Sequence, residues 1–134
     1  INHILNRKIE YCNNNGLSIK CMVCGELKGV SDYDIHIILE NLLDNAIEAA
    51  LKAVNKRISV DIYSDEQAMV IKISNTTEEN VLKNNPEMNT TKKDNSYHGY
   101  GIKNVSELVK KNNGTIEYIQ LGVDIVQCRV LLML

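Results

Sequence analysis

Residues 37–50 read Ile-Ile-Leu-Glu-Asn-Leu-Leu-Asp-Asn-Ala-Ile-Glu-Ala-Ala, and the expected fold is built around this segment. It contains no Gly or Pro, and the helix-favouring residues Leu, Ala, Glu and Ile dominate it, so it predicts a helix. Apolar side chains cover more than half of the helix circumference. Such a helix is buried in a domain rather than lying on its surface.

Four polar side chains share one narrow face of this helix when residues are spaced by about 100°. They are Asn41, Asp44, Asn45 and Glu48. On a buried helix we expect this strip to be buried or half-buried, and buried amides and carboxylates need partners. Two interpretations remain open at this point: a polar network that ties the helix to a neighbour, or a site for a ligand or metal ion.

Length and composition limit the possible classes of protein. The chain has 134 residues, enough for one domain with a real core, and it contains no Trp and no Phe. The core must therefore consist of Ile, Leu, Val and Tyr. The net charge of −2 gives no electrostatic footprint for nucleic acid. No apolar run reaches the ~18 residues of a membrane span, and no signal peptide is visible. Because the chain starts without Met and ends on a strand-like run, we expect it to be part of a longer protein.

Two of the four cysteines, Cys21 and Cys24, have the spacing of zinc ligands or of a redox pair. No second pair matches them, and in a strand this odd separation directs the two sulfurs to opposite faces. We therefore expect reduced thiols rather than a metal site. The three histidines are scattered along the chain, without ligand spacing.

Hydrophobic periodicity and turn residues predict the order of the elements. We expect a helix to about residue 14, a strand over 17–23, the central helix from Ser31 or Asp32 to about Asn55, a hairpin of strands 58–63 and 69–73, a helix over 102–111, and strands 115–119 and 123–133 with a turn at Gly122. This order predicts an α/β (α+β) two-layer sandwich, in which helices cover one face of a mixed β-sheet.

A polar segment at about residues 76–100, rich in Asn and Thr, separates the hairpin from the last helix. Such a long irregular stretch is often a functional lid, although a surface insertion is the plainer interpretation. His98-Gly99-Tyr100-Gly101 stands at the end of this segment and leads directly into the predicted helix. Two glycines before a helix allow close backbone approach, and the N–H groups of a helix start favour an anion such as phosphate.

Three segments together resemble a known family. Residues 41–49, Asn-Leu-Leu-Asp-Asn-Ala-Ile-Glu-Ala, resemble the N box of the GHKL superfamily, and residues 98–105 resemble its G2 box. Asn75-Thr76 stands where the G1 box falls. The chain is similar over its whole length to the ATP-binding catalytic domain of sensor histidine kinases, with the Bergerat fold. Within that group it resembles the accessory-gene-regulator type, the kinases of peptide quorum-sensing receptors.

The resemblance implies roles for individual residues. It implies that Asn45 binds the Mg²⁺ that bridges the ATP phosphates, with Asn41 nearby. It places Asn75 where most of the family has the Asp that accepts a hydrogen bond from the adenine amino group. An amide oxygen can accept this bond, but more weakly. Thr76 and Thr77 stand where the family usually has a Gly, so the adenine pocket is altered there.

Further binding residues are implied by the same boxes and by the lid. Gly99 and Gly101 would hold the triphosphate through backbone N–H groups, and Glu48, Tyr100 and Ile102 belong to the same ATP-binding boxes. Lys92 or Lys93 in the lid could reach the phosphates, although loop charges are commonly solvated.

The resemblance also implies a reaction. Where ATP-hydrolysing relatives have a Glu that activates water, this chain has Asn41, which cannot act as a base. Phosphoryl transfer to a histidine on a separate dimerisation domain is therefore favoured over hydrolysis. This acceptor is not recognisable in the sequence. We expect a cytoplasmic domain of a membrane-anchored bacterial receptor, with a response regulator downstream. The alternatives are a GHKL protein-serine kinase of the anti-sigma type and a non-catalytic nucleotide-binding module.

Overall fold

The computed structural model describes residues 1–26, 29–78 and 96–134, with side chains described from residue 104 onward in the last range. It contains three helices and five strands in the described residues. They are α1 (Asn2–Asn14), β1 (Ser18–Cys24), α2 (Asp32–Leu51), β2 (Arg57–Ser64), β3 (Ala68–Thr76), α4 (Ser96–Lys111), β4 (Gly114–Gly122) and β5 (Ile125–Met133).

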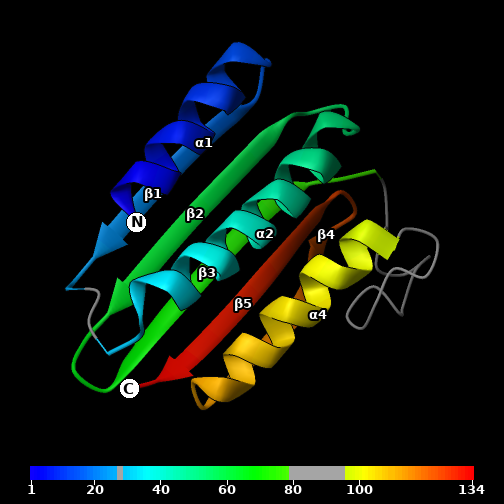
Figure 1. Cartoon of the computed structure of the whole chain (residues 1–134). Helices are drawn as coiled ribbons and strands as arrows, with labels where there is room; N and C mark the ends of the chain where they lie inside the picture. Colours follow the sequence, from blue (N-terminus) through cyan, green and yellow to red (C-terminus); the bar gives the residue numbers. More distant parts are fainter. Residues whose placement is uncertain (27–28, 79–95) are drawn as a thin grey trace.

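The five strands form one mixed sheet in the order β1-β2-β3-β5-β4. β1 pairs in parallel with β2, whereas the β2–β3, β3–β5 and β4–β5 pairs are antiparallel. All three helices lie on the same face of the sheet, with α2 across its middle and α1 and α4 to either side (Figure 1). The predicted two-layer sandwich with a mixed sheet is confirmed.

The core fills the space between α2 and the sheet. Ile38, Leu39 and Leu43 of α2 are fully buried, as are Ile71 of β3 and Val130 of β5. These side chains recur at helical spacing on α2 and at every second residue on the strands, the two periods that direct one face of each element inward. Residues 37–50 therefore lie in the central buried helix of the fold.

α2 begins after Ser31, one of the two expected starting residues, and Ser31 caps the helix. The Ser31 hydroxyl accepts a hydrogen bond from the backbone N–H of Asp34, which satisfies a donor that has no partner within the helix. The other end differs from the prediction, because α2 ends at Leu51 rather than near Asn55. The Lys52 N–H bonds to the carbonyl of Ala49 three residues back, which tightens the last turn and stops the helix.

Two further boundaries differ from the predictions. β4 continues through Gly122, so the turn before β5 lies at Val123 and Asp124 rather than at Gly122. α4 begins at Ser96 instead of residue 102, and this places Gly99 and Gly101 within the helix. A glycine inside a helix costs only about 1 kcal/mol relative to alanine, so the favourable sequence after residue 102 can extend the helix backwards through both.

All four cysteines are free thiols. Cys21 is aligned with Val60 and Cys24 with Tyr63, which places them on opposite faces of β1 as strand alternation predicts. Among the described residues, no helix is both long and apolar enough to cross a membrane.

Candidate nucleotide-binding site

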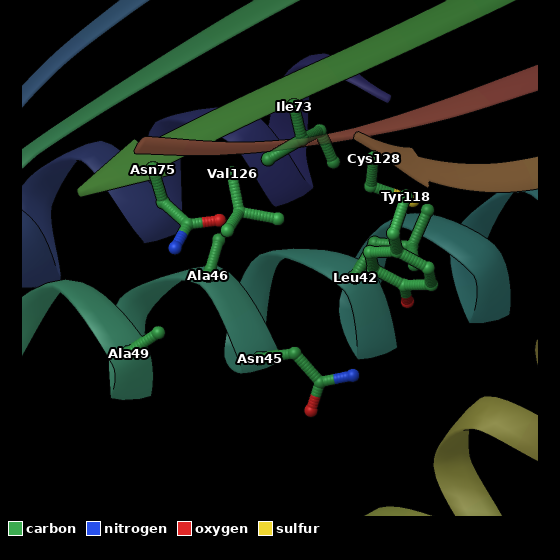
Figure 2. A pocket seen from close by; sticks show the side chains of 9 residues that line it. All are labelled: Leu42, Asn45, Ala46, Ala49, Ile73, Asn75, Tyr118, Val126 and Cys128. Atoms are coloured by element: carbon green, nitrogen blue, oxygen red, sulfur yellow. The ribbon is translucent and has the colours of Figure 1, made fainter. Parts of the chain in front are cut away.

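A pocket lies between α2 and the strands β3, β5 and β4 (Figure 2). Two of the predicted site residues, Asn45 from α2 and Asn75 from β3, line it together. The remaining wall is mostly apolar. It is formed by Leu42, Ala46, Ala49, Ile73, Tyr118, Val126 and Cys128. Two asparagines from separate sequence motifs are thus brought to one apolar pocket, the usual composition of a small-molecule site.

Asn75 lies near the end of β3, one residue before its last, as the sequence predicted. Its side-chain nitrogen donates a hydrogen bond to the carbonyl oxygen of Thr76 at 3.1 Å. The nitrogen is therefore engaged at the strand, and Figure 2 shows the amide oxygen directed toward Ala46 and Val126. The side chain presents a hydrogen-bond acceptor to the pocket.

Asn45 lies at the rim of the same pocket. It is half-buried, and Figure 2 shows its amide extending away from the sheet, on the side of α2 where α4 lies. Asn41, one turn earlier, donates from its side-chain nitrogen to the carbonyl of Ile37 at 2.8 Å and is not part of the pocket wall. Glu48, one turn after Asn45, is half-buried, and its carboxylate lies 3.9 Å from the Lys52 ammonium.

The expectation that the whole polar strip of α2 is buried or half-buried is wrong at Asp44, which is exposed. Its carboxylate accepts a hydrogen bond from Lys8 of α1 at 2.5 Å. Lys8 also donates to Glu40 at 3.0 Å, and Arg7 donates to the other oxygen of Glu40 at 2.6 Å. The flank of α2 that carries Glu40 and Asp44 therefore binds α1, while Asn45 faces the pocket.

These ion pairs determine the charge of Glu40. Burial alone would raise the pKa of Glu40, but the hydrogen bond from Lys8 and the positive charges of Lys8 and Arg7 outweigh it and hold the pKa below its ordinary value. Glu40 directly precedes Asn41 in the sequence, so it is the nearest candidate for a catalytic base. As an ionised group held by two cations, it is poorly suited to accept a proton from water.

The two threonines after Asn75 are both buried, and each forms a hydrogen bond within the protein. The Thr76 hydroxyl accepts from the backbone N–H of Arg57 at 3.0 Å, which joins the end of β3 to the start of β2. The Thr77 hydroxyl donates to the carbonyl of Glu78, and the Thr77 N–H donates to the carbonyl of Asp124 at 2.8 Å. Neither threonine is part of the pocket wall.

The residues of the predicted phosphate-binding segment are only partly described. Gly99, Tyr100, Gly101 and Ile102 lie in the first turns of α4 rather than before it, so the expectation that both glycines precede the helix is wrong. Lys92 and Lys93, with most of the predicted lid, lie outside the described residues.

Sequence reasoning missed the strand residues of the pocket wall, above all Tyr118. In the register of the sheet, Asn75 is aligned with Val126 and Tyr118 with Cys128, so the pocket floor crosses three strands. Alternation within each strand could have placed these side chains on the inner face. Their meeting with Asn75 depends on the strand order, which the sequence does not reveal.

Within residues 1–26, 29–78 and 104–134, whose side chains are described, no group of three or more His, Cys, Asp or Glu is arranged to hold a metal ion. A search of curated protein sequences gives no significant match.

Comparison with solved structures shows the same fold at low sequence identity. The chain superimposes on a histidine kinase of Acinetobacter baumannii, AdeS, with a TM-score of 0.68 and 14% identity over 98% of this chain and 64% of that one. It thus spans less than two thirds of the AdeS chain. It also matches the nucleotide-free catalytic domain of the histidine kinase ThkA, with a TM-score of 0.72 and 15% identity over 99% of this chain and 91% of that one.

A third structure agrees with these two. The mycobacterial sensor histidine kinase MprB matches with a TM-score of 0.71 and 15% identity, covering 98% of this chain and 93% of that one. The family model described as "GHKL domain" matches residues 30–131, from the turn before α2 to near the end of β5. The matched range contains both asparagines of the pocket, and the chain belongs to the GHKL domain family.

Proposed function

We propose that this chain is the ATP-binding catalytic domain of a two-component sensor histidine kinase. One observation carries the proposal: Asn45 and Asn75, 30 positions apart, line one apolar pocket, and Asn75 directs an acceptor oxygen into it. A flat purine ring suits the apolar walls, and its exocyclic amino group suits the Asn75 oxygen.

The phosphates would lie toward the rim, where the Asn45 amide extends on the α4 side of α2. An amide oxygen is a suitable ligand for Mg²⁺, which retains several waters and is otherwise bound by phosphate oxygens. The bound Mg²⁺ would neutralise charge on the β- and γ-phosphates during transfer. In this arrangement Asn75 recognises the base, and Asn45 orients the metal-bound phosphates.

Phosphoryl transfer is favoured over hydrolysis by the pairing of the acids on α2. In the transfer, a nitrogen of an acceptor histidine bonds to the γ-phosphorus, the bond to the bridging oxygen breaks, and ADP leaves. An imidazole is already a nucleophile. The domain therefore needs to position the γ-phosphate and neutralise its charge, rather than to remove a proton from the acceptor. Glu40 and Asp44, the acids adjacent to the two N-box asparagines, are held by Lys8 and Arg7. The same pairing argues against an anti-sigma serine kinase, which needs a basic carboxylate near this position.

The proposal includes partners beyond this chain. The acceptor histidine would lie on the dimerisation domain of the same kinase, and the phosphoryl group would pass to a response regulator. The N-box and G2-box sequences favour a receptor of the accessory-gene-regulator type, anchored in the membrane with this domain in the cytoplasm.

A phosphotransfer assay tests the proposal. We would incubate the chain with radiolabelled ATP and Mg²⁺, with and without the dimerisation domain of its own receptor. Label should appear on that domain as acid-labile phosphohistidine, while the chain alone releases phosphate only at background. Acid-stable phosphoserine would support the anti-sigma alternative. ATP binding without transfer would support a non-catalytic module.

A further inference from the structure

The pocket contains a polar group that the N, G1 and G2 boxes do not include. Tyr118 of β4 lines the pocket, and Figure 2 shows its ring extending from the sheet toward Leu42 of α2. The hydroxyl oxygen is buried and has no hydrogen-bond partner among the described side chains and backbone groups. A buried hydroxyl without a partner lowers the stability of the folded protein, so this residue calls for an explanation.

The surroundings of Tyr118 keep the hydroxyl protonated. Burial raises the pKa of the Tyr118 phenol, and the adjacent Cys128 adds to the effect. Burial also raises the pKa of Cys128, to about 12, so the thiol beside the ring is neutral as well. The neighbouring Cys128 thiol interacts with the phenol only weakly and does not satisfy its hydroxyl. The Tyr118 O–H group can therefore donate a hydrogen bond to a ligand in the pocket.

Tyr118 and Asn75 approach the pocket from two sides. They lie on β4 and β3, which flank β5, and their aligned residues on β5 are Cys128 and Val126. Their Cα atoms are thus about 7 Å apart along the strands and about 10 Å apart across them. Side chains that point inward from such positions can contact two edges of one flat ligand lying between them.

We propose that the Tyr118 hydroxyl is a specificity-determining group that donates a hydrogen bond to a ring nitrogen of the bound purine. The inference rests on the proposed function and extends it. A purine offers ring nitrogens as acceptors beside the amino group assigned to Asn75, so the two residues together match a donor and an acceptor of one base. Among the described residues, the pocket wall around Tyr118 contains no cationic side chain, which favours the neutral base over the phosphates.

Tyr118→Phe tests this inference, because it removes the hydroxyl and keeps the ring. The dissociation constants for ATP and ADP would be measured by calorimetry on the 134-residue chain, together with the thermal midpoint without ligand. Tyr63→Phe is the matched control, since Tyr63 lies on the outer face of the sheet and is 54% exposed. We expect Tyr118→Phe to weaken ATP and ADP equally, by about 3- to 10-fold. Its ligand-free midpoint should stay equal or rise, because an unpaired buried hydroxyl is removed.

Each contrary result has a distinct meaning. Wild-type binding that Tyr118→Phe leaves unchanged would overturn this inference and leave the proposed function standing. A lower ligand-free midpoint with unchanged affinity would show that the hydroxyl serves the fold alone, which also overturns it. If Tyr118→Phe weakened the binding of ATP but not of ADP, the hydroxyl would contact the γ-phosphate, and this would contradict the proposed contact with the base. A wild-type chain that binds neither nucleotide would overturn the proposed function and the inference together.

Discussion

Asp34, in the first turn of α2, and Lys111, the last residue of α4, form an ion pair with 3.1 Å between the carboxylate oxygen and the ammonium nitrogen. Asp34 also accepts a hydrogen bond from the side chain of Asn112 at 3.2 Å, and its own side chain is only 4% exposed. This buried carboxylate joins the two helices that flank the proposed phosphate-binding region, so it fixes their relative position.

Asp34 should make the stability of the protein sensitive to acid. The hydrogen bond from Asn112 lowers the pKa of Asp34; burial opposes this effect, and Lys111 adds to it. Because the folded pKa lies below the ordinary value, the stabilisation is present above about pH 4 and is lost as the pH falls further, through the folded pKa. Asp34→Asn should lower the free energy of unfolding at pH 7 by about 1–3 kcal/mol.

Denaturant unfolding at pH 7, 4 and 3 would measure this effect. The difference between wild type and Asp34→Asn should shrink as the pH falls. Asp32→Asn is the matched control, because Asp32 lies in the same helical turn but is exposed. A difference that stays constant down to pH 3 would contradict the assigned role of the Asp34 charge.

Lys8 should stabilise the contact between α1 and α2. Its side chain is 11% exposed and binds both Glu40 and Asp44. Lys8→Met keeps the aliphatic stem, but leaves two carboxylates one turn apart without their shared cation. We expect Lys8→Met to lower the free energy of unfolding at pH 7, measured with denaturant, by about 1–2 kcal/mol. The control Lys52→Met, at an exposed lysine, should lower it by less than about 0.5 kcal/mol.

The pH dependence of the Lys8 contribution has the opposite sign to that of Asp34. Burial lowers the pKa of Lys8, but the hydrogen bonds from Lys8 to Asp44 and Glu40 outweigh burial, and the net pKa is raised above 10.5. The stabilisation is therefore complete below about pH 10.5 and is lost as the pH rises through the folded pKa. A Lys8→Met effect that disappears near neutral pH would argue against this assignment.

Asn75 should control the affinity for adenine nucleotides. Asn75→Ala removes the acceptor in the pocket and should weaken ATP binding by about tenfold, measured by calorimetry. Asn75→Asp supplies a charged acceptor and should bind ATP at least as tightly as wild type. The carboxylate cannot donate to the Thr76 carbonyl, so the same variant should lower the thermal midpoint. Equal ATP affinity of wild type, Asn75→Ala and Asn75→Asp would contradict a role for Asn75 in nucleotide binding.

Gly25 should tolerate substitution less well than Gly16. Both have positive φ angles, +89° and +73°, which side chains rarely adopt. A Cβ at Gly25 would lie 1.8 Å from the carbonyl oxygen of Ser64, whereas one at Gly16 meets nothing within 4 Å. Gly16→Ala should therefore lower the free energy of unfolding by about 1–2 kcal/mol because of its φ angle alone, and Gly25→Ala should lower it by more. Similar losses in denaturant unfolding for both variants would contradict the close approach to Ser64.

The sequence predicted those helices and strands in which the pattern of apolar residues runs without interruption. The apolar circumference of residues 37–50 indicated a buried helix, and alternation indicated the β2–β3 hairpin, because both patterns depend on neighbours within one element. The position of Asp44 beside α1 could not be predicted in this way, because it depends on a contact with Lys8, which lies 36 positions earlier on another helix. The two glycines at the start of α4 misled the prediction because the favourable sequence after residue 102 can outweigh the modest cost of glycine in a helix.

The sequence predicted only those residues of the pocket that belong to local motifs. Asn45 and Asn75 stood out because they belong to recognisable motifs. Tyr118 did not, because its place in the pocket depends on the strand order β3-β5-β4 and on a register that pairs it with Cys128. Such long-range pairings are properties of the folded sheet rather than of any local stretch of sequence.

Calorimetric titration with ATP, with and without Mg²⁺, tests whether Asn45 takes part in nucleotide binding when Asn45→Ala is measured beside wild type. We expect wild type to bind ATP and Mg²⁺ to strengthen the binding. Asn45→Ala should lose most of this Mg²⁺-dependent gain in affinity, by at least about tenfold or about 1.4 kcal/mol. Failure of wild type to bind at millimolar ATP, or a Mg²⁺ effect that is unchanged in Asn45→Ala, would contradict this expectation.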